Sequence, residues 1–179
     1  MEILMKWDGQ LLLWIEKYLR VDWMNGFWCA ITFLGDGGWF WILAGLILCF
    51  FKQKRKVGFM ALLSMAICAL IVNVLLKNMV ARIRPYEILS DLSILVNKQS
   101  DYSFPSGYTT ASFASAWIYF KRLDKPLGIM AMILATAIAF SRLYVGVHYP
   151  SDVLAGFVIA WGVSFLILWL EERKFKKEN

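Results

Sequence analysis

The sequence contains a single histidine, His148, among its 179 residues, and only three cysteines. Cys29, Cys49 and Cys68 lie in apolar surroundings, and no two of them form a C-x-x-C pair. This pattern is typical of reduced cysteines that pack against other side chains, and it argues against a disulfide framework or a zinc site. We therefore expect no bound metal and no cofactor.

A cleavable signal peptide is also not evident. Glu2, Lys6 and Asp8 interrupt the N-terminal apolar residues, and no small-residue cleavage site follows an apolar core. The chain shows no internal repeat and no segment with the composition of a soluble domain. We expect membrane insertion to depend on internal spans, and residues 1–179 to form a single domain.

Apolar residues are abundant instead. The chain is 60% hydrophobic, with nine tryptophans and thirteen phenylalanines, which is well above the level of soluble globular proteins. Residues 57–76 contain no charge and form the clearest spanning helix. Four shorter apolar runs cover residues 39–51, 105–120, 127–141 and 153–170. The sequence predicts an all-α polytopic membrane helix bundle with five spans.

The first 35 residues have a different, amphipathic pattern. Aromatic and aliphatic residues alternate there with five charges between Lys6 and Arg20. So many charges favour a helix that lies in the membrane interface. A short sixth span over 21–35 is the alternative. Residues 35–38, Gly-Asp-Gly-Gly, predict a turn, and residues 36–179 are expected to form the helical core.

The net charge of +6 reflects topology rather than nucleic-acid binding. Segments 52–56, 121–125 and 173–177 hold eleven of the nineteen Lys and Arg residues. With five spans these segments share one side, which the positive-inside rule assigns to the cytoplasm. The loop 77–104 and the stretch 141–152 then share the external face. We expect a multi-pass protein of the inner (plasma) membrane whose site is external or periplasmic, with the bilayer as its partner.

The single histidine lies in the polar stretch 141–152, between two apolar runs. Pro150 suits the first turn of a helix, which places His148 just before that helix and Asp152 one turn further on. A carboxylate there can accept from one imidazole nitrogen and leave the other free as a nucleophile. Arg142 adds a planar cation that matches phosphate geometry. The pattern indicates phosphoryl transfer, and the alternative is a polar turn with a surface histidine.

Anion-binding signals mark both ends of the external loop. Lys77, Arg82 and Arg84 lie on the outer face, where the positive-inside rule does not explain them. Arg82 suits a snorkelling residue that meets lipid headgroups better than the other two do. Ser106 and Gly107 begin a helix whose free N–H groups favour an anion, unless they are an ordinary helix start.

Together these segments resemble the signature of the type-2 phosphatidic acid phosphatase superfamily of membrane lipid phosphatases, which shares its site with the vanadium haloperoxidases. The family pattern is K-x6-R-P, then P-S-G-H, then S-R-x5-H-x3-D. The matching residues are Lys77, Arg84, Pro85, Pro105, Ser106, Gly107, Ser141, Arg142, His148 and Asp152. The resemblance extends from about residue 36 to the end, and a haloperoxidase is disfavoured because those relatives are soluble.

The resemblance implies a role for each matching polar residue. Lys77, Arg84 and Arg142 would hold phosphate oxygens, with help from Ser106 and the Gly107 amide. No metal is implied, because the fixed cations neutralise the charge that metals neutralise elsewhere.

The resemblance also implies the chemical steps. His148 would attack phosphorus and form a phosphohistidine, Asp152 would orient its imidazole, and water would release phosphate. One position departs from the pattern, because Tyr108 stands where the family has the histidine that protonates the leaving group. A positioned acid contributes about 10²–10⁴-fold, and tyrosine, with an unperturbed pKa of about 10, is a poor acid near neutrality. We expect phosphate binding to persist and turnover to be low.

The leading hypothesis is a membrane lipid phosphatase that hydrolyses a lipid phosphate or a polyprenyl diphosphate. Candidate substrates are undecaprenyl diphosphate, phosphatidylglycerol phosphate and phosphatidic acid, and the small size favours the first. The alternative is a catalytically silent membrane protein that binds lipid phosphates or acts as a scaffold. A transporter or channel is disfavoured because the polar groups gather at one face rather than at mid-membrane. The oligomeric state is left open.

Overall fold

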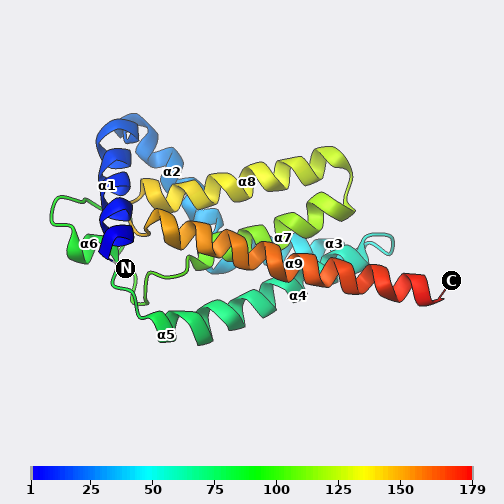
Figure 1. Ribbon diagram of the computed structural model, residues 1–179. Helices are drawn as coiled ribbons and strands as arrows, with labels where there is room; N and C mark the ends of the chain where they lie inside the picture. Colours follow the sequence, from blue (N-terminus) through cyan, green and yellow to red (C-terminus); the bar gives the residue numbers. More distant parts are fainter. Residues whose placement is uncertain (1, 179) are drawn as a thin grey trace.

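The computed structural model describes residues 2–178, with side chains described from residue 5 to residue 174, and every regular element in that range is helical. Figure 1 shows their arrangement. The elements in chain order are α1 (Glu2–Leu19), α2 (Asp22–Leu34), the 3₁₀ turn η1 (Asp36–Gly38), α3 (Trp39–Phe50), α4 (Arg55–Ala69), the π-helical η2 (Leu70–Leu76), α5 (Lys77–Val80), α6 (Pro85–Ile88), α7 (Gly107–Arg122), α8 (Lys125–Tyr144) and α9 (Pro150–Glu178). The predicted all-α class is confirmed.

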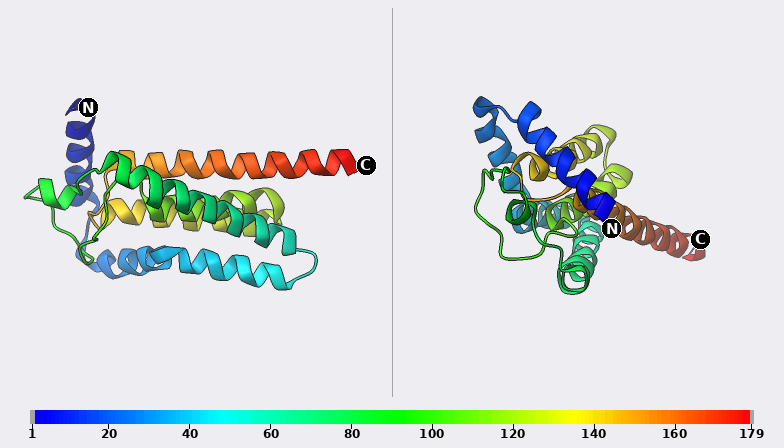
Figure 2. Two further views of the ribbon diagram at one scale, coloured as in Figure 1. Left: turned by 90° about the horizontal axis from the view of Figure 1, so that it is seen from below. Right: turned by 60° about the vertical axis from the view of Figure 1, so that its left-hand side comes forward.

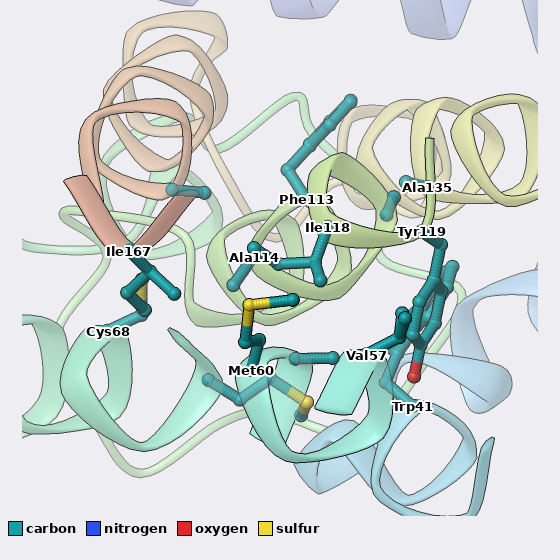
Figure 3. Close-up of a cluster of buried hydrophobic side chains, with 14 of the residues drawn as sticks. Trp41, Val57, Met60, Cys68, Phe113, Ala114, Ile118, Tyr119, Ala135 and Ile167 are labelled. Atoms are coloured by element: carbon teal, nitrogen blue, oxygen red, sulfur yellow. The ribbon is translucent and has the colours of Figure 1, made fainter. Parts of the chain in front are cut away.

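Helix α7 lies at the centre of the bundle, packed against α4, α8 and α9. Small side chains along it, including Ser112, Ala114 and Ala116, are fully buried, and small residues let neighbouring helix backbones approach closely. The main apolar core surrounds this helix: Phe113 of α7 belongs to it together with Met60 and other side chains from α3, α4, α8 and α9 (Figure 3).

The predicted five spans are not confirmed. Within the described residues, three helical stretches are long and apolar enough to cross a membrane: Arg55–Ile88, Lys125–Tyr144 and Pro150–Lys174. Helices α2 and α3 qualify only together, as a pair bent by 44°. With 16 residues, α7 is about 24 Å long at 1.5 Å per residue, shorter than the apolar core of a bilayer.

The predicted span over 39–51 and the alternative sixth span over 21–35 are not confirmed as separate spans, because α2 and α3 are long and apolar enough only as one bent pair. The predicted break at 35–38 is present, because Gly37 and Gly38 adopt φ of 54° and 71°, which interrupts the helix. This break bends the chain and does not reverse it, so α3 continues the course of α2 (Figure 2).

The two ends of the bundle differ in character (Figure 2). The α3–α4 turn, the α7–α8 turn and the C-terminal end of α9 lie at one end. The loop after α5 and the α8–α9 turn lie at the other, where α1 crosses the direction of the bundle. The outer face of α1 carries Trp7 and Trp14, which are 69% and 48% exposed, while Asp8 on the inner face is buried. This orientation agrees with the interfacial position expected for the N-terminal segment.

Candidate active site

His148 lies in the tight turn between α8 and α9. Helix α8 ends at Tyr144, and Pro150 is the first residue of α9, as the sequence predicts. The turn requires Gly146, whose φ is 80° and where an added Cβ would lie 2.8 Å from the Ser93 carbonyl oxygen. The His148 ring is only 1% exposed, so the alternative of a surface histidine is wrong.

Asp152 lies beside the Nδ1 side of this ring. Its Oδ2 accepts from the Ser103 hydroxyl at 2.6 Å and from the Tyr149 backbone N–H at 2.9 Å. The separation between His148 Nδ1 and Asp152 Oδ2 is 3.5 Å, longer than a formed hydrogen bond, and Nδ1 has no closer partner among the described residues. Catalytic hydrogen bonds are often long in an empty site and shorten on binding.

Arg84 faces the other side of the ring. Its Nη1 lies 3.5 Å from His148 Nε2 and donates to the Val147 carbonyl at 2.8 Å. The guanidinium is therefore fixed close to the imidazole nitrogen that Asp152 leaves free. A phosphoryl group bound in front of Nε2 would therefore lie next to the Arg84 guanidinium.

Arg142, at the end of α8, has unused hydrogen-bonding capacity. Its side chain is buried, and Nη1 donates to the Thr32 hydroxyl at 2.6 Å. Nε and Nη2 are also buried and have no partner among the described residues. Buried donors without a partner are costly, so such a group indicates a missing acceptor. An oxyanion between Arg142 and Arg84 is the acceptor that fits both cations.

The burial of His148 affects its protonation. Burial is the main cause that lowers the pKa of its imidazole to about 4; Arg84 and Arg142 act in the same direction, and Asp152 opposes the shift. A histidine with a lowered pKa stays neutral at physiological pH, because it takes up a proton only when the pH falls through that value. The Nε2 lone pair is thus available to a substrate.

Lys77 lies at the start of α5, directly after the π-helical η2, and its backbone N–H donates to the Val72 carbonyl five residues earlier. Its ammonium forms an ion pair with Asp101, whose other carboxylate oxygen accepts from Arg84 Nη2 at 2.5 Å. Burial opposes ionisation of Asp101, but Lys77 and Arg84 outweigh it and lower its pKa. A carboxylate thus forms ion pairs with two of the three cations that the resemblance assigns to phosphate.

We predict that Asp101→Asn strengthens the binding of vanadate, a phosphate analogue, by roughly tenfold, equivalent to about 1.4 kcal/mol. Asp101 is about half exposed and is ionised at neutral pH, so an incoming anion must displace it from Lys77 and Arg84. Calorimetric titration measures the affinity without turnover. Asp91→Asn is the matched control: this carboxylate lies in the same loop and, among the described residues, accepts a hydrogen bond only from the Ser90 hydroxyl. Unchanged or weaker vanadate binding in Asp101→Asn contradicts this role.

Ser106 and Gly107, where the sequence predicts an anion site, lie at the start of α7. The Ser106 hydroxyl caps α7 by accepting from the Thr109 N–H at 3.4 Å and the Thr109 hydroxyl at 3.0 Å. A Cβ at Gly107 would lie 3.9 Å from Lys77 Nζ. This glycine therefore borders the cation cluster, by which we mean Lys77, Arg84 and Arg142. The ordinary helix-start interpretation accounts for the Ser106 hydroxyl, and its contact with phosphate stays a prediction.

Tyr108 contacts the cluster through its ring. The Arg142 guanidinium lies over that ring at 3.6 Å from the centroid. The Tyr108 hydroxyl donates to Asp36 Oδ1 at 2.7 Å, in the α2–α3 break. A Cβ at Gly35 would lie 2.7 Å from Tyr108 Cδ1, so the glycine-rich break provides room for this side chain. The phenol is thus engaged by Asp36.

The prediction that Arg82 is a snorkelling residue is wrong. Its side chain is 11% exposed and forms ion pairs with Asp152 and Asp8, both at 2.7 Å. Sequence reasoning assigned no role to Asp8, although one signal was present: Asp8 shares a helical face with Leu12 and Ile15, which are both buried. A carboxylate on the apolar face of an amphipathic helix requires a partner.

A cavity of about 580 Å³ adjoins the cation cluster. Lys77, Asp101, Gly107 and Tyr108 line its polar end. It continues between α3, α4 and α7, where the lining is apolar: Ile42, Leu62, Met65, Ala66, Cys68, Ala69 and Val72. Within the described residues no group of three His, Cys, Asp or Glu side chains is arranged to hold a metal ion. The arrangement suits a ligand with an anionic head and an apolar tail.

Comparisons with known proteins agree with this arrangement. Residues 58–176 match the model of the PAP2 superfamily. The chain is 32% identical over 157 residues to undecaprenyl-diphosphatase of Sulfolobus acidocaldarius, covering 87% of this chain and 74% of that protein. It is 31% identical over 167 residues to phosphatidylglycerophosphatase B of Bacillus subtilis, covering 87% and 79%.

The fold is also similar to a solved structure. The crystal structure of a transmembrane PAP2-type phosphatidylglycerolphosphate phosphatase from Bacillus subtilis matches with a TM-score of 0.80 at 27% identity, covering 97% of this chain and 88% of that one. With the family model matching more than half of its residues, this chain belongs to the PAP2 superfamily.

Proposed function

We propose that this protein is an integral membrane lipid phosphatase that works through a phosphohistidine on His148. One observation supports this best: the buried imidazole faces Arg84 and lies beside Arg142, whose Nε and Nη2 have no partner among the described residues. Lys77 and Arg84 share the carboxylate of Asp101, and Arg142 forms no ion pair within the described residues, so these cations are not fully neutralised. The adjoining apolar cavity accounts for a lipid rather than a soluble phosphate ester.

The proposed reaction has two steps. His148 Nε2 forms a bond to phosphorus while the bond from phosphorus to the lipid oxygen breaks, and Asp152 stabilises the positive charge that develops on the ring. Lys77, Arg84 and Arg142 neutralise the phosphoryl oxygens as the charge on them grows. The departing lipid oxygen takes a proton from solvent where the leaving group is an alkoxide, and a lipid monophosphate leaves as the anion. Water then attacks phosphorus, the bond from phosphorus to Nε2 breaks, and phosphate leaves with the protons of that water, which restores the neutral imidazole.

The substrate class follows from the relatives. One relative is named for undecaprenyl diphosphate and another for phosphatidylglycerol phosphate. We favour a polyprenyl diphosphate such as undecaprenyl diphosphate, with phosphatidylglycerol phosphate and phosphatidic acid as alternatives. Phosphate release from detergent-purified protein across these three lipids tests the proposal, and no release from any of them, in this chain or in Tyr108→His, contradicts it.

A second candidate function rests on Tyr108. Its hydroxyl donates to Asp36, so the position of the expected general acid offers no free proton donor. A protein that binds a lipid phosphate without hydrolysing it would have this arrangement. Vanadate binding together with absent phosphate release would favour such a lipid-phosphate-binding or scaffold role.

We propose that the site faces the periplasm or the cell exterior, because the basic turns lie at the opposite end of the bundle (Figure 2). In a background without native cysteines, Ser90→Cys in the exposed external loop should react with a membrane-impermeant thiol reagent in intact cells. Gln53→Cys, exposed in the α3–α4 turn, should react only after lysis. The reverse pattern of labelling would reverse the topology.

A further inference from the structure

Asp8 links α1 to the first turn of α9. The carboxylate is 5% exposed, and its Oδ1 accepts from the Ser151 backbone N–H at 3.0 Å. Oδ2 accepts from Arg82 Nη2 at 2.7 Å and from the Ser151 hydroxyl. Every polar contact of this carboxylate thus leads to Arg82 or to the residue beside Asp152.

Arg82 lies between two buried carboxylates. Nη1 donates to Asp152 Oδ1 and Nη2 to Asp8 Oδ2, both at 2.7 Å. The guanidinium also lies over the Tyr149 ring, 3.9 Å from its centroid. A planar cation held at two nitrogens and against one face has a single orientation, which a lysine ammonium would not reproduce.

We infer that Asp8 and Arg82 are positioning residues of the active site, which set the orientation and the effective charge of Asp152 as His148 experiences it. The inference rests on the proposed function in one respect, that His148 is the nucleophile. Arg82 occupies Asp152 Oδ1, so Oδ2 is the oxygen left to face His148 Nδ1. The N-terminal amphipathic helix thereby contributes to catalysis without touching the substrate.

The two charges have opposite effects on the histidine. The positive charge of Arg82 weakens the negative potential of Asp152 at the imidazole, and the negative charge of Asp8 offsets Arg82. Removal of Arg82 should therefore strengthen the hold of Asp152 on an imidazolium proton. Removal of the Asp8 charge should weaken it.

The remaining charged groups around His148 are the same in both variants. Arg84 and Arg142 face it from the segment before α6 and from α8, and Asp101 and Lys77 follow beyond Arg84 in the same chain of ion pairs. The phenols of Tyr108 and Tyr149 lie over Arg142 and Arg82. A difference between the variants thus reports on Asp8 and Arg82.

The titration of His148 can be followed directly, because the sequence contains no other histidine. Full-length protein labelled on histidine and purified without a polyhistidine tag should give imidazole signals from one ring. We expect Arg82→Gln to raise the pKa of His148 and Asp8→Asn to lower it, each by roughly one pH unit.

A merely structural role gives a different result. If both substitutions only loosened the turn, the ring would become hydrated and its pKa would rise in both variants towards the ordinary value of about 6.5. The direction in which the pKa of His148 moves in Asp8→Asn therefore distinguishes the positioning role from a structural one. A rise or no change in that variant overturns the inference, and a fall together with a rise in Arg82→Gln supports it.

Glu16→Gln is the matched control. Glu16 is a second described carboxylate of α1 that contacts this end of the bundle, where it accepts from the Ser93 N–H at 3.0 Å and from Arg20 at 2.8 Å. Its removal should loosen α1 without moving the His148 titration. Arg82→Lys keeps the positive charge but loses the two guanidinium nitrogens that bond both carboxylates. The pKa of His148 should therefore stay near the parent value, while kcat falls about 10²-fold at unchanged KM.

The titration needs no turnover, so it separates the two proposals. Opposite shifts in a chain that releases no phosphate would support the positioning network and refute the phosphatase function. Normal phosphate release with shifts in the same direction would leave the phosphatase function and refute the positioning role.

Discussion

His148→Ala should reduce phosphate release by about 10⁴- to 10⁶-fold, the loss typical of a removed catalytic nucleophile. Nε2 is the imidazole nitrogen that faces Arg84, and the other charged residues of the cluster offer no comparable nucleophile at neutral pH. The fold should survive, because Nδ1 has no hydrogen-bond partner among the described residues. The measurement is kcat/KM for a lipid diphosphate. It is taken in both the parent and the Tyr108→His background, because the parent alone is expected to be too slow for so large a loss to be measured.

Val147→Ala is the control for this experiment, since it truncates a neighbouring side chain that is also fully buried in the turn. It should lower the melting temperature more than His148→Ala does and retain turnover. Phosphate release by His148→Ala within tenfold of the parent would rule out the nucleophile assignment. A phosphorylated peptide trapped from the parent should contain residue 148.

Tyr108→His should raise activity on every lipid phosphate, by about 10²–10⁴-fold where the leaving group is poor. A phosphate monoester leaves as an alkoxide, which needs a proton, whereas a lipid diphosphate leaves as a lipid monophosphate, which is a far weaker base. The gain should therefore be larger for the monoester. The comparison of kcat/KM for one monoester and one diphosphate in both proteins measures this difference.

Tyr108→Phe isolates the role of the hydroxyl. The ring would still lie against Arg142, while the hydrogen bond to Asp36 is lost. Because the hydroxyl is engaged by Asp36, we expect this variant to be as slow as the parent. Equal gains on both substrates in Tyr108→His would point to steric relief, and no gain would show that Tyr108 does not occupy the general-acid position.

The residues expected to carry chemistry were predictable because three short motifs hold them at defined spacings. The structure brings Arg84 and Asp152 to opposite sides of His148, although Arg84 is far away in the sequence. Arg142 also lies in this cluster, as the spacing before His148 indicates. Their catalytic roles stay predictions until the variants are measured.

The contacts of Asp8, Arg82 and Asp101 were not predictable in the same way. Each depends on how one segment docks on another: α1 on α9 for Asp8, and the loop between α6 and α7 on α5 for Asp101. The charge and spacing of residues along the chain do not predict which segments pack against each other. Arg82 was misassigned for this reason, since a cation at a membrane surface has lipid headgroups as an equally ordinary partner.

The span count failed for a geometric reason. Hydropathy identifies apolar runs but not the angle between successive ones. At residues 35–38 two left-handed glycines redirect the chain by 44°, so the apolar runs before and after them form one bent pair. Residues 105–120 were counted as a span from their composition, but α7 has only 16 residues and is not among the three stretches long enough to cross a membrane.

The π-helical segment η2 allows one membrane helix to present apolar side chains outward and Lys77 inward without a single helical periodicity. Each residue of a regular α-helix turns the chain by about 100°, and the wide turns of a π-helix interrupt that progression. Residues of the helix before and after η2 therefore need not follow a common periodicity. Lys77, the first residue after it, faces Asp101 and the polar end of the cavity, while Leu70 and Val74 within it are 63% and 65% exposed on the outer surface. A deletion of one residue between 70 and 76 would leave hydropathy almost unchanged and yet rotate Lys77 away from Asp101 and the cavity, so the length of this apolar run is as tightly constrained as the motif that follows it.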